Sequence, residues 1–392
     1  MPKPEPKREP APPLVAALPV AELGEEERIA CLRLIRSDTV GPVTFRELIN
    51  HFGSARAALA AVPELSRRAG RTIRICSRED AEAELARARA AGARPLFTIE
   101  PGYPMALAVL DAPPPLLYAK GRPELLNRPI VAVVGSRQCS AAGVKLARHF
   151  AAELGRAGYV VASGLARGID SIAHEAAIGH GTIAVLAGGI DVVYPPENEA
   201  LQEAIGARGC LVTEMPFGFV PRAKDFPRRN RIISGIALGV LIVEAARRSG
   251  TLVTARFAAE QGREVFAVPG HPLDPRAEGT NKLLKSGATL VTEPEDLLSA
   301  LAPLTRHPAA HLRDEEVAPF APDIAAAPPP PLSEQDRDRV VAALGPAPVD
   351  VDSLVRGTGL SIRAVQAALI ELALAGRIER HGNGLVSLLP GH

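Results

Sequence analysis

The sequence is poor in the residues that mark secreted, membrane-spanning and metal-dependent proteins. It has no tryptophan, and its four cysteines lie far apart without forming a CxxC pair. Scattered cysteines argue against a zinc site or a disulfide framework and fit a reducing compartment. No apolar run reaches the roughly 18 residues of a membrane span, and the first 13 residues are too rich in proline and charge for a signal peptide. We therefore expect a cytoplasmic protein that enters no membrane.

An excess of charge of one sign is also missing. The chain has 45 lysines and arginines against 44 aspartates and glutamates, which gives a formal net charge of +1. Any nucleic-acid binding must therefore come from a local basic patch rather than from the overall charge. Hydrophobic residues make up 47% of the 392 residues, which is enough for full-sized cores in two or three domains.

Common catalytic and phosphate-binding motifs are absent too. No GxxxxGK[ST] segment occurs, and Gly135–Gly143 does not match GxGxxG, so neither the Walker P-loop nor the dinucleotide fingerprint is present. His174 follows Asp170 by four residues, which would suit an acid–base pair, although a capping or helix-surface contact is the commoner reason for that spacing. No carboxylate cluster has metal-ligand spacing. We predict no catalytic residue, no metal site and no cofactor.

The most informative stretch that is present runs from Ile130 to Gly143. Five apolar residues, Ile130–Val134, predict a strand buried on both faces, as in a parallel sheet. Gly135 allows a sharp turn, and a helical pattern opens near Ser140. The N-terminus of that helix should hold a phosphate above the end of the strand, with Arg137 at the edge to meet it.

Strand and helix patterns alternate regularly through residues 95–300. The expected strands after the short extended pieces near residue 95 are Ile130–Val134, Tyr159–Ala162, Thr182–Leu186, Cys210–Thr213, Val240–Val243, Val265–Val268 and Ala288–Val291. This alternation predicts an α/β domain of the extended Rossmann type, with a doubly wound parallel sheet. The right-handed crossover rule then places the carboxyl ends of the strands along one rim.

Shorter segments flank this domain on both sides. We expect a disordered tail at 1–20, a helical domain at 21–94 and a proline-rich linker at 301–332. The helices near Glu25–Ala61 suit either a helix-hairpin-helix that holds a DNA backbone or a plain packing domain. Residues 333–392 show three helices and a hairpin, the winged-helix pattern, and Ser333 with Asp336 marks the start of the first helix. Its third helix, Ser361–Ala375, could enter a major groove, or the module could contact protein or act as a spacer.

Small polar residues follow several of the predicted strands. Ser163-Gly164 ends one strand, Gly188-Gly189 ends the next, and Ser249-Gly250-Thr251 opens a helix after Glu244. Each glycine alone predicts only a turn, but together these turns bring backbone N–H groups and hydroxyls to one rim. The rim is therefore the expected binding edge.

A basic insert between two strands gives the sharpest signal. Residues 221–231 read PRAKDFPRRNR, with five cations against Asp225 and with Phe226 inside the segment. Cations for phosphates beside a ring for a base are what a single strand needs. We therefore expect Lys224, Arg228 and Arg231 to gather in one patch with Arg137 over the ends of the strands. The alternative is a solvated charged loop with Phe226 in the core.

Several motifs of residues 95–300 belong together. They are GSR at 135–137, SGLARGID at 163–170, FPRRNRIISG at 226–235, EAARRSGTLVTA at 244–255, VPG at 268–270 and GTN at 279–281. In these motifs the chain resembles the DNA-processing protein A (DprA/Smf) family. The resemblance implies an extended Rossmann domain, an N-terminal helical domain likened to sterile-alpha-motif folds and a C-terminal winged helix. It further implies a bacterial, non-enzymatic homodimer that protects incoming single-stranded DNA and loads a RecA-type recombinase on it during natural transformation.

The same resemblance implies a set of DNA-binding residues. Arg137 would contact phosphate, Ser163, Gly164 and Gly168 would shape the floor, and Phe226 would stack on a base or anchor the core. Four cations of the insert would bind phosphates, and Asn230 would bond to backbone or sugar. The implied site is Gly135, Ser136, Arg137, Ser163, Gly164, Gly168, Lys224, Phe226, Arg228, Arg229, Asn230, Arg231, Ser249, Gly250 and Thr251.

Two other functions fit parts of the sequence. A Rossmann-type enzyme that hydrolyses a nucleoside monophosphate would use the acidic helix start at Glu244–Thr251. A winged-helix transcription regulator would instead bind duplex DNA at a specific sequence.

Overall fold

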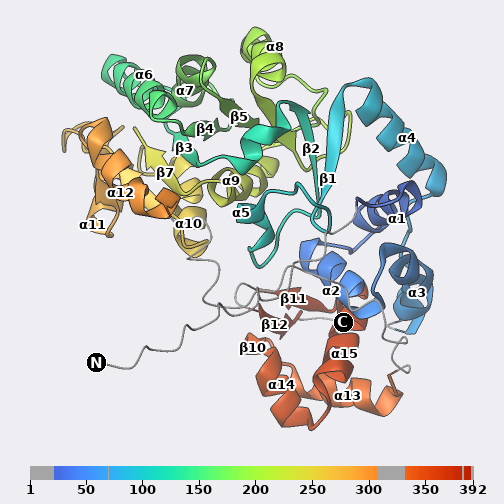
Figure 1. Ribbon diagram of the computed structural model, residues 1–392. Coiled ribbons are helices and arrows are strands. Elements are labelled where there is room, and N and C mark those ends of the chain that lie inside the picture. Colours follow the sequence, from blue (N-terminus) through green and yellow to red (C-terminus); the bar gives the residue numbers. More distant parts are fainter. Residues whose placement is uncertain (1–21, 69, 307–331, 382–383, 390–392) are drawn as a thin grey trace, which may run out of the picture.

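The computed structural model describes residues 22–68, 70–306, 332–381 and 384–389. The predicted tail at 1–20, residues 307–331 of the predicted linker and the hairpin residues 382–383 lie outside the described residues. In Figure 1 the α/β domain lies at the top, the N-terminal helices at the right and the C-terminal module below them.

Among the described residues, nine strands form one large sheet in the order β1-β2-β6-β5-β4-β3-β7-β8-β9. Its strands are β1 (Ala93–Phe97), β2 (Leu116–Gly121), β3 (Ile130–Val134), β4 (Val160–Ser163), β5 (Thr182–Val185), β6 (Cys210–Thr213), β7 (Gly239–Ile242), β8 (Glu264–Ala267) and β9 (Thr289–Leu290). The seven strands from β6 to β9 in this order are parallel, which confirms the predicted doubly wound sheet. Antiparallel β1 and β2 make the whole sheet mixed.

Helices cover both faces of the parallel part. They are α5 (Met105–Ala108), α6 (Ala141–Arg156), α7 (Ile169–Ala177), α8 (Glu199–Arg208), α9 (Asp225–Gly235), α10 (Thr251–Glu260), α11 (Glu278–Lys285) and α12 (Pro294–Arg306). The central strand β3 is buried along its whole length, as predicted. Its odd-numbered residues share a core with α6, α7 and α12, and its even-numbered residues share one with α9 and α10. Period-two alternation therefore builds one core on each face of the sheet.

Two helices differ from the expectation. Residues 225–231 of the basic insert, for which no helix was predicted, form the first part of α9. Pro227 is compatible with that helix because it lies in the first turn, where its missing N–H has no partner to lose. Helix α12 continues to Arg306, so residues 301–306 belong to a helix and not to the predicted linker.

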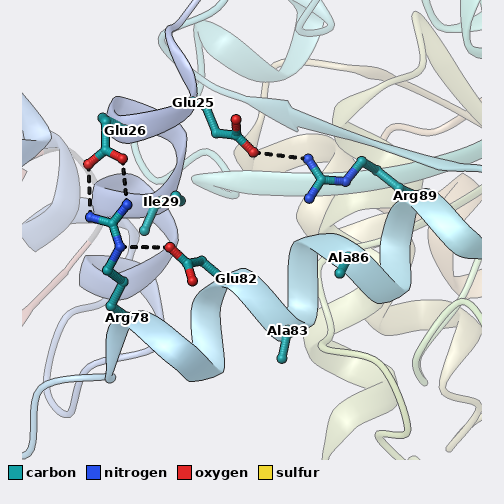
Figure 2. A pocket seen from close by; sticks show the side chains of 8 residues that line it. All are labelled: Glu25, Glu26, Ile29, Arg78, Glu82, Ala83, Ala86 and Arg89. Atoms are coloured by element: carbon teal, nitrogen blue, oxygen red, sulfur yellow. Dashed lines mark hydrogen bonds and ion pairs between the residues drawn. The ribbon is translucent and has the colours of Figure 1, made fainter.

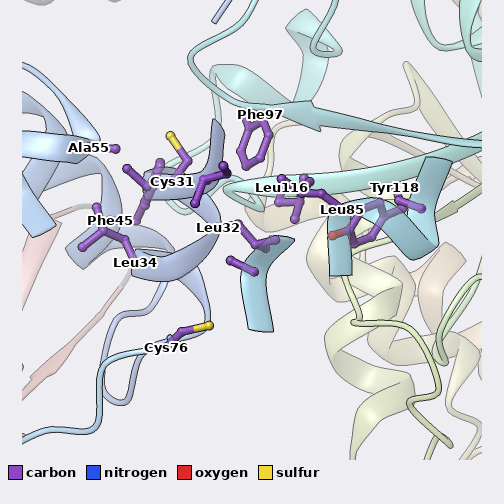
Figure 3. Close-up of a cluster of buried hydrophobic side chains, with 14 of the residues drawn as sticks. Cys31, Leu32, Leu34, Phe45, Ala55, Cys76, Leu85, Phe97, Leu116 and Tyr118 are labelled. Atoms are coloured by element: carbon purple, nitrogen blue, oxygen red, sulfur yellow. The ribbon is translucent and has the colours of Figure 1, made fainter. Parts of the chain in front are cut away.

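The N-terminal domain consists of α1 (Glu25–Ile35), α2 (Pro42–Phe52), α3 (Ala55–Arg68) and α4 (Arg78–Ala90). Its core is continuous with one end of the large sheet, since Leu32, Leu34 and Phe45 cluster with Phe97 and Tyr118 (Figure 3). Ion pairs on the outer surface join α1 to α4, where Arg78 lies between Glu26 and Glu82 (Figure 2).

The C-terminal module has the predicted three helices and two hairpin strands, and a short further strand at Val349–Asp350 that was not predicted. They are α13 (Glu334–Ala343), β10 (Val349–Asp350), α14 (Val351–Thr358), α15 (Ile362–Leu374), β11 (Ile378–Arg380) and β12 (Leu385–Leu388). Ser333 caps α13 by accepting from the Asp336 N–H, as the sequence suggested. No single helix of the described part is long and apolar enough to cross a membrane; α14 and α15 pass such a test only as a pair bent by 114°.

Candidate nucleic-acid interface

The loops at the carboxyl ends of the parallel strands are tied to one another, as predicted for the rim. The N–H of Ile169 donates to the Ser136 carbonyl, and the Thr251 hydroxyl donates to the Gly135 carbonyl. Gly168 has a φ of 76°, and a Cβ at this position would lie 2.4 Å from the Ser136 oxygen. Glycine is thus required both for the backbone conformation and for the close approach of the two loops.

A buried arginine braces this rim from below. Arg229 of α9 is 5% exposed, and its Nη1 donates to the carbonyls of Gly164 and Val185, at the ends of β4 and β5. Burial lowers the pKa of Arg229 to about 10, with buried Asp170 acting in the opposite direction, so the guanidinium stays charged at neutral pH. This placement makes Arg229 a positioning residue and does not support the direct phosphate contact expected for it.

An arginine and two aromatic rings meet above this brace. The Arg137 guanidinium carbon lies 5.3 Å from the centre of the Phe226 ring, and the Tyr194 ring centre lies 5.4 Å from it. Arg137 is exposed, Tyr194 is 43% exposed and Phe226 is half-buried. We call Arg137, Tyr194 and Phe226 the rim cluster. It presents a cation next to planar faces, the combination that holds a phosphate and an unpaired base.

The sequence prediction missed Tyr194. This residue lies in the loop after β5. The sequence could have indicated it, because an aromatic residue follows Gly188 and Gly189 in a loop at the end of a predicted strand. The structure adds it because Phe226, from a distant part of the chain, packs against it.

The N-terminus of α6 does not match the expectation of a phosphate site. Glu244, from the loop after β7, accepts from the N–H of Ser140 and from its hydroxyl. A Cβ on Gly143 would lie 2.6 Å from the Glu244 carboxyl carbon. A carboxylate therefore already occupies the positive end of this helix, so the prediction of a phosphate site there is wrong. Glu244 is also the acidic residue on which the nucleotide-hydrolase alternative depends, and it is used here in a structural contact.

The sequence predicts that the cations of the basic insert form one cluster with Arg137, and the structure shows that they do not. Because it is helical, residues 224, 228 and 231 share one face, and residues 226, 229 and 230 share another. The second face packs on the strand ends, whereas Arg228 and Arg231 turn to Glu214 after β6, at N–O distances of 2.9 and 2.7 Å. The predicted single patch is therefore two separate groups on opposite faces of α9.

Other predicted site residues have mainly structural partners. The buried Ser163 hydroxyl donates to the Val133 carbonyl, and Asn230 Nδ2 donates to the Gly250 carbonyl at 3.4 Å. The Ser249 hydroxyl accepts from the Thr251 N–H at the start of α10. The Ser136 hydroxyl accepts from the Gln138 N–H. These residues shape the rim, and any contact between them and DNA stays a prediction.

His174 is not part of an acid–base pair with Asp170. Its Nδ1 lies 2.7 Å from the Thr182 hydroxyl, which itself donates to the Val161 carbonyl. Since the hydroxyl proton is used there, Nδ1 must donate, and the buried Nε2 has no partner in the described part of the chain. Burial lowers the pKa of His174 to about 3. His174 is fully buried, so the spacing marks neither an acid–base pair between these two side chains nor a helix-surface contact. Asp170 instead accepts from the N–H groups of Gly164 and Ala166, before α7.

The second half of the third helix of the winged helix is covered, whereas its first turn, with Ile362 and Arg363, is exposed. Ile370 and Leu374 of α15 belong to the core of the N-terminal domain, and α15 packs against α2 and α3 (Figure 1). Arg380, after α15, forms an ion pair of 2.6 Å with Glu47 of α2. This packing gives the module a contact within the chain, and entry into a major groove, contact with another protein and a spacer role all stay predictions.

The fold and the rim together define a class of protein. It is a Rossmann-like α/β protein whose binding edge offers an arginine beside aromatic faces, without a P-loop or a dinucleotide fingerprint. Within that class, the chain belongs to the DNA recombination-mediator protein A family, whose model matches residues 94–302. Further models match the DprA-like N-terminal HHH domain at 25–87 and the DprA winged helix domain at 324–384. The first of these agrees with the helix-hairpin-helix alternative for the N-terminal helices.

Relatives of known structure and sequence support this assignment. Protein Smf of Escherichia coli is 40% identical over 73% of this chain and 75% of its own length. The structure of DNA processing protein A from Streptococcus pneumoniae matches with a TM-score of 0.59 and 33% identity, covering 71% of this chain and 98% of that one. DNA processing protein A from Helicobacter pylori, described for its single-stranded DNA binding mode, matches with a TM-score of 0.50 and 30% identity over 54% of this chain and 96% of that one.

Proposed function

We propose that this protein binds single-stranded DNA at the rim cluster and acts as a recombination mediator. The observation that carries the proposal is the position of Arg137 beside the Phe226 ring, with the exposed Tyr194 on the same ring. Arg137 would bind a phosphate, and the aromatic residues would stack on a base. Stacking of this kind contributes about 1–3 kcal/mol per base and requires bases that are not paired.

The wider role is part of the same proposal. The protein would protect incoming DNA and load a RecA-type recombinase on it during natural transformation. It would do so as a cytoplasmic homodimer and without catalysing a reaction. Membership of the recombination-mediator family and the described binding mode of the Helicobacter relative support this role.

Arg137→Ala tests the rim cluster directly. Binding of a fluorescent oligothymidylate, titrated over salt, should weaken, and the slope of log K against log salt should fall by about 0.7 for each lost phosphate contact. Arg156→Ala is the matched control, because this exposed arginine ends α6 at the opposite edge of the sheet and pairs with Glu153. An affinity and slope equal to those of the wild type would refute the proposed site.

The same assay separates the alternatives. A competing duplex should displace the labelled strand poorly, because its bases are already paired and stacked. Tight duplex binding with no preference for single strands would favour a transcription regulator instead. Release of base from nucleoside monophosphates by the wild-type protein would favour the nucleotide hydrolase.

A further inference from the structure

A cavity lies on the other side of α9 from the rim cluster. Its volume is about 690 Å³, within the range of small-ligand sites, and it is lined by α9, the loop after β6 and the connection from α1 to α2. Neither Arg137 nor Phe226 lines it. The cavity is therefore distinct from the rim cluster, although Lys224, two residues before Phe226, lines its edge.

Cations outnumber acids in this cavity. Its charged lining consists of two carboxylates, Glu214 and Asp225, and five cationic side chains, Arg36, Arg222, Lys224, Arg228 and Arg231. Both carboxylates are engaged: Glu214 accepts from Arg228 and Arg231, and Asp225 accepts from the Arg222 N–H at 2.8 Å. Arg222 and Lys224 are exposed and have no ion pair in the described ranges. An anion entering the cavity would meet charge that the protein does not itself neutralise.

The remainder of the lining is apolar. Val40 and Pro42 come from the N-terminal domain, Leu116 from β2, and Met215 and Phe219 from the loop after β6. Cations next to an apolar wall suit a ligand that has an anionic part and an apolar part. A nucleotide of a single strand has both parts, whereas the bases of a duplex are not available to such a wall.

A second hollow, between α1 and α4, shows what a lining without unpaired charge looks like. There Arg78 is bonded to Glu26 and Glu82, and Arg89 is bonded to Glu25 (Figure 2). Each charged group of that hollow has an ion-pair partner, and its three carboxylates outnumber its two arginines, so it has no excess of positive charge for an anionic ligand. The cavity beside α9 differs in this respect.

We propose that the cavity beside α9 is a second subsite for the same DNA strand, which passes from the rim cluster over Lys224 into it. A phosphate of the strand binds Arg222, Lys224 and Arg228, and a base packs on the wall that includes Phe219. This inference rests on the proposed function, because the strand must first bind at the rim. It assigns to the N-terminal domain a part in holding DNA, through Val40 and Pro42.

The test combines a double variant with strands of different length. Arg222→Ala/Arg228→Ala removes two exposed cations, and Glu214 keeps its bond to Arg231, so the fold should persist. Oligothymidylates of about 4 to about 20 nucleotides are titrated over salt against the wild type, the double variant, Arg137→Ala and the control Arg156→Ala. Arg222→Lys/Arg228→Lys, which keeps both charges, serves as the rescue variant.

The proposal predicts a loss that depends on length. For the long strands the salt slope of the double variant should be lower by about 1.4, from two lost contacts of about 0.7 each, and the lysine variant should regain it. The shortest strand, held at the rim alone, should bind the double variant as it binds the wild type. Arg137→Ala should weaken binding at every length.

Two results distinguish a failure of the second subsite from a failure of the proposed function. If Arg137→Ala weakens binding but the double variant matches the wild type at every length, the second subsite is refuted and the rim site stands. If Arg137→Ala has no effect, the proposed function itself fails. Photo-crosslinking of iodouracil strands gives an independent readout, with Met215 and Phe219 as the expected points of attachment and their absence counting against the subsite.

Discussion

Helices α9 and α15 were both candidates for contact with nucleic acid, and they differ in how they pack against the rest of the protein. Helix α9 packs one face on the strand ends and turns basic residues toward a cavity on its other face. Helix α15 packs its second half in its own module and against α2 and α3, whereas its first turn, with Ile362 and Arg363, is exposed. A helix that holds a partner needs one face committed to the fold and one left open. Helix α9 meets that condition, and α15 gives its second face to the N-terminal domain.

The largest effect should separate two adjacent arginines of α9. Arg229→Ala should cost about 3–5 kcal/mol of unfolding free energy, because it leaves Asp170 buried without its nearby cation and two carbonyls without their donor. Arg228→Ala should cost about 1 kcal/mol or less, since its side chain is 52% exposed. Urea denaturation measures both. Equal losses would mean that the two faces of α9 are not as different as the structure indicates.

The docking of α15 should be broken by charge reversal. Glu47→Arg places a second cation against Arg380, whose side chain is only 15% exposed, and should weaken docking by about 3 kcal/mol. The double swap Glu47→Arg/Arg380→Glu should restore most of it. Hydrogen exchange of the α15 amides reports the docking. Protection that is unchanged in Glu47→Arg would show that α15 is not held by this surface.

Acid should weaken the support behind the rim. The folded protein keeps His174 neutral down to a pKa of about 3, whereas the unfolded chain protonates it near 6.5, so the unfolded state binds more protons between these values. Stability should therefore fall as the pH drops, by about 2 kcal/mol from this group between pH 7.5 and 5. His174→Gln should remove that part of the slope in urea titrations. An identical pH slope in the variant would contradict the assignment.

The smallest effect is expected at Tyr194. Tyr194→Ala removes one exposed stacking face and should weaken single-strand binding about tenfold, from the loss of about 1.4 kcal/mol of stacking. Tyr194→Phe, which keeps the ring, should bind like the wild type. An equal loss in both variants would point to the hydroxyl instead of the ring.

Local sequence signals predicted the central part of the fold well. The apolar runs Ile130–Val134 and Cys210–Thr213 are strands with these bounds, because each is buried on both faces and ends at a turn. Ser333 as a helix cap also needed only local information. Helix α9 was missed because charge and Pro227 hide its apolar period, and only packing on the sheet shows that Ile232, Ile233 and Ile236 are its buried face.

The site was harder to predict because its key contacts join distant residues. Glu244 reaches the start of α6 from a position 104 residues away, and nothing near Ser140 in the sequence indicates it. The division of the insert into two groups likewise depends on which residues share a face of α9. This could not be predicted, because the sequence did not indicate that the insert is helical. Residue types at the rim were predictable, but the side of α9 on which each cation lies was not.

The most direct test of the account is where a bound strand touches the protein. An iodouracil-substituted oligonucleotide, cross-linked to the wild-type protein and mapped by mass spectrometry, compares the two helices in one experiment. The account predicts attachment at Tyr194 and Phe226, lost in Arg137→Ala and absent from α15. Attachment along α15, with none at the rim cluster, would contradict it.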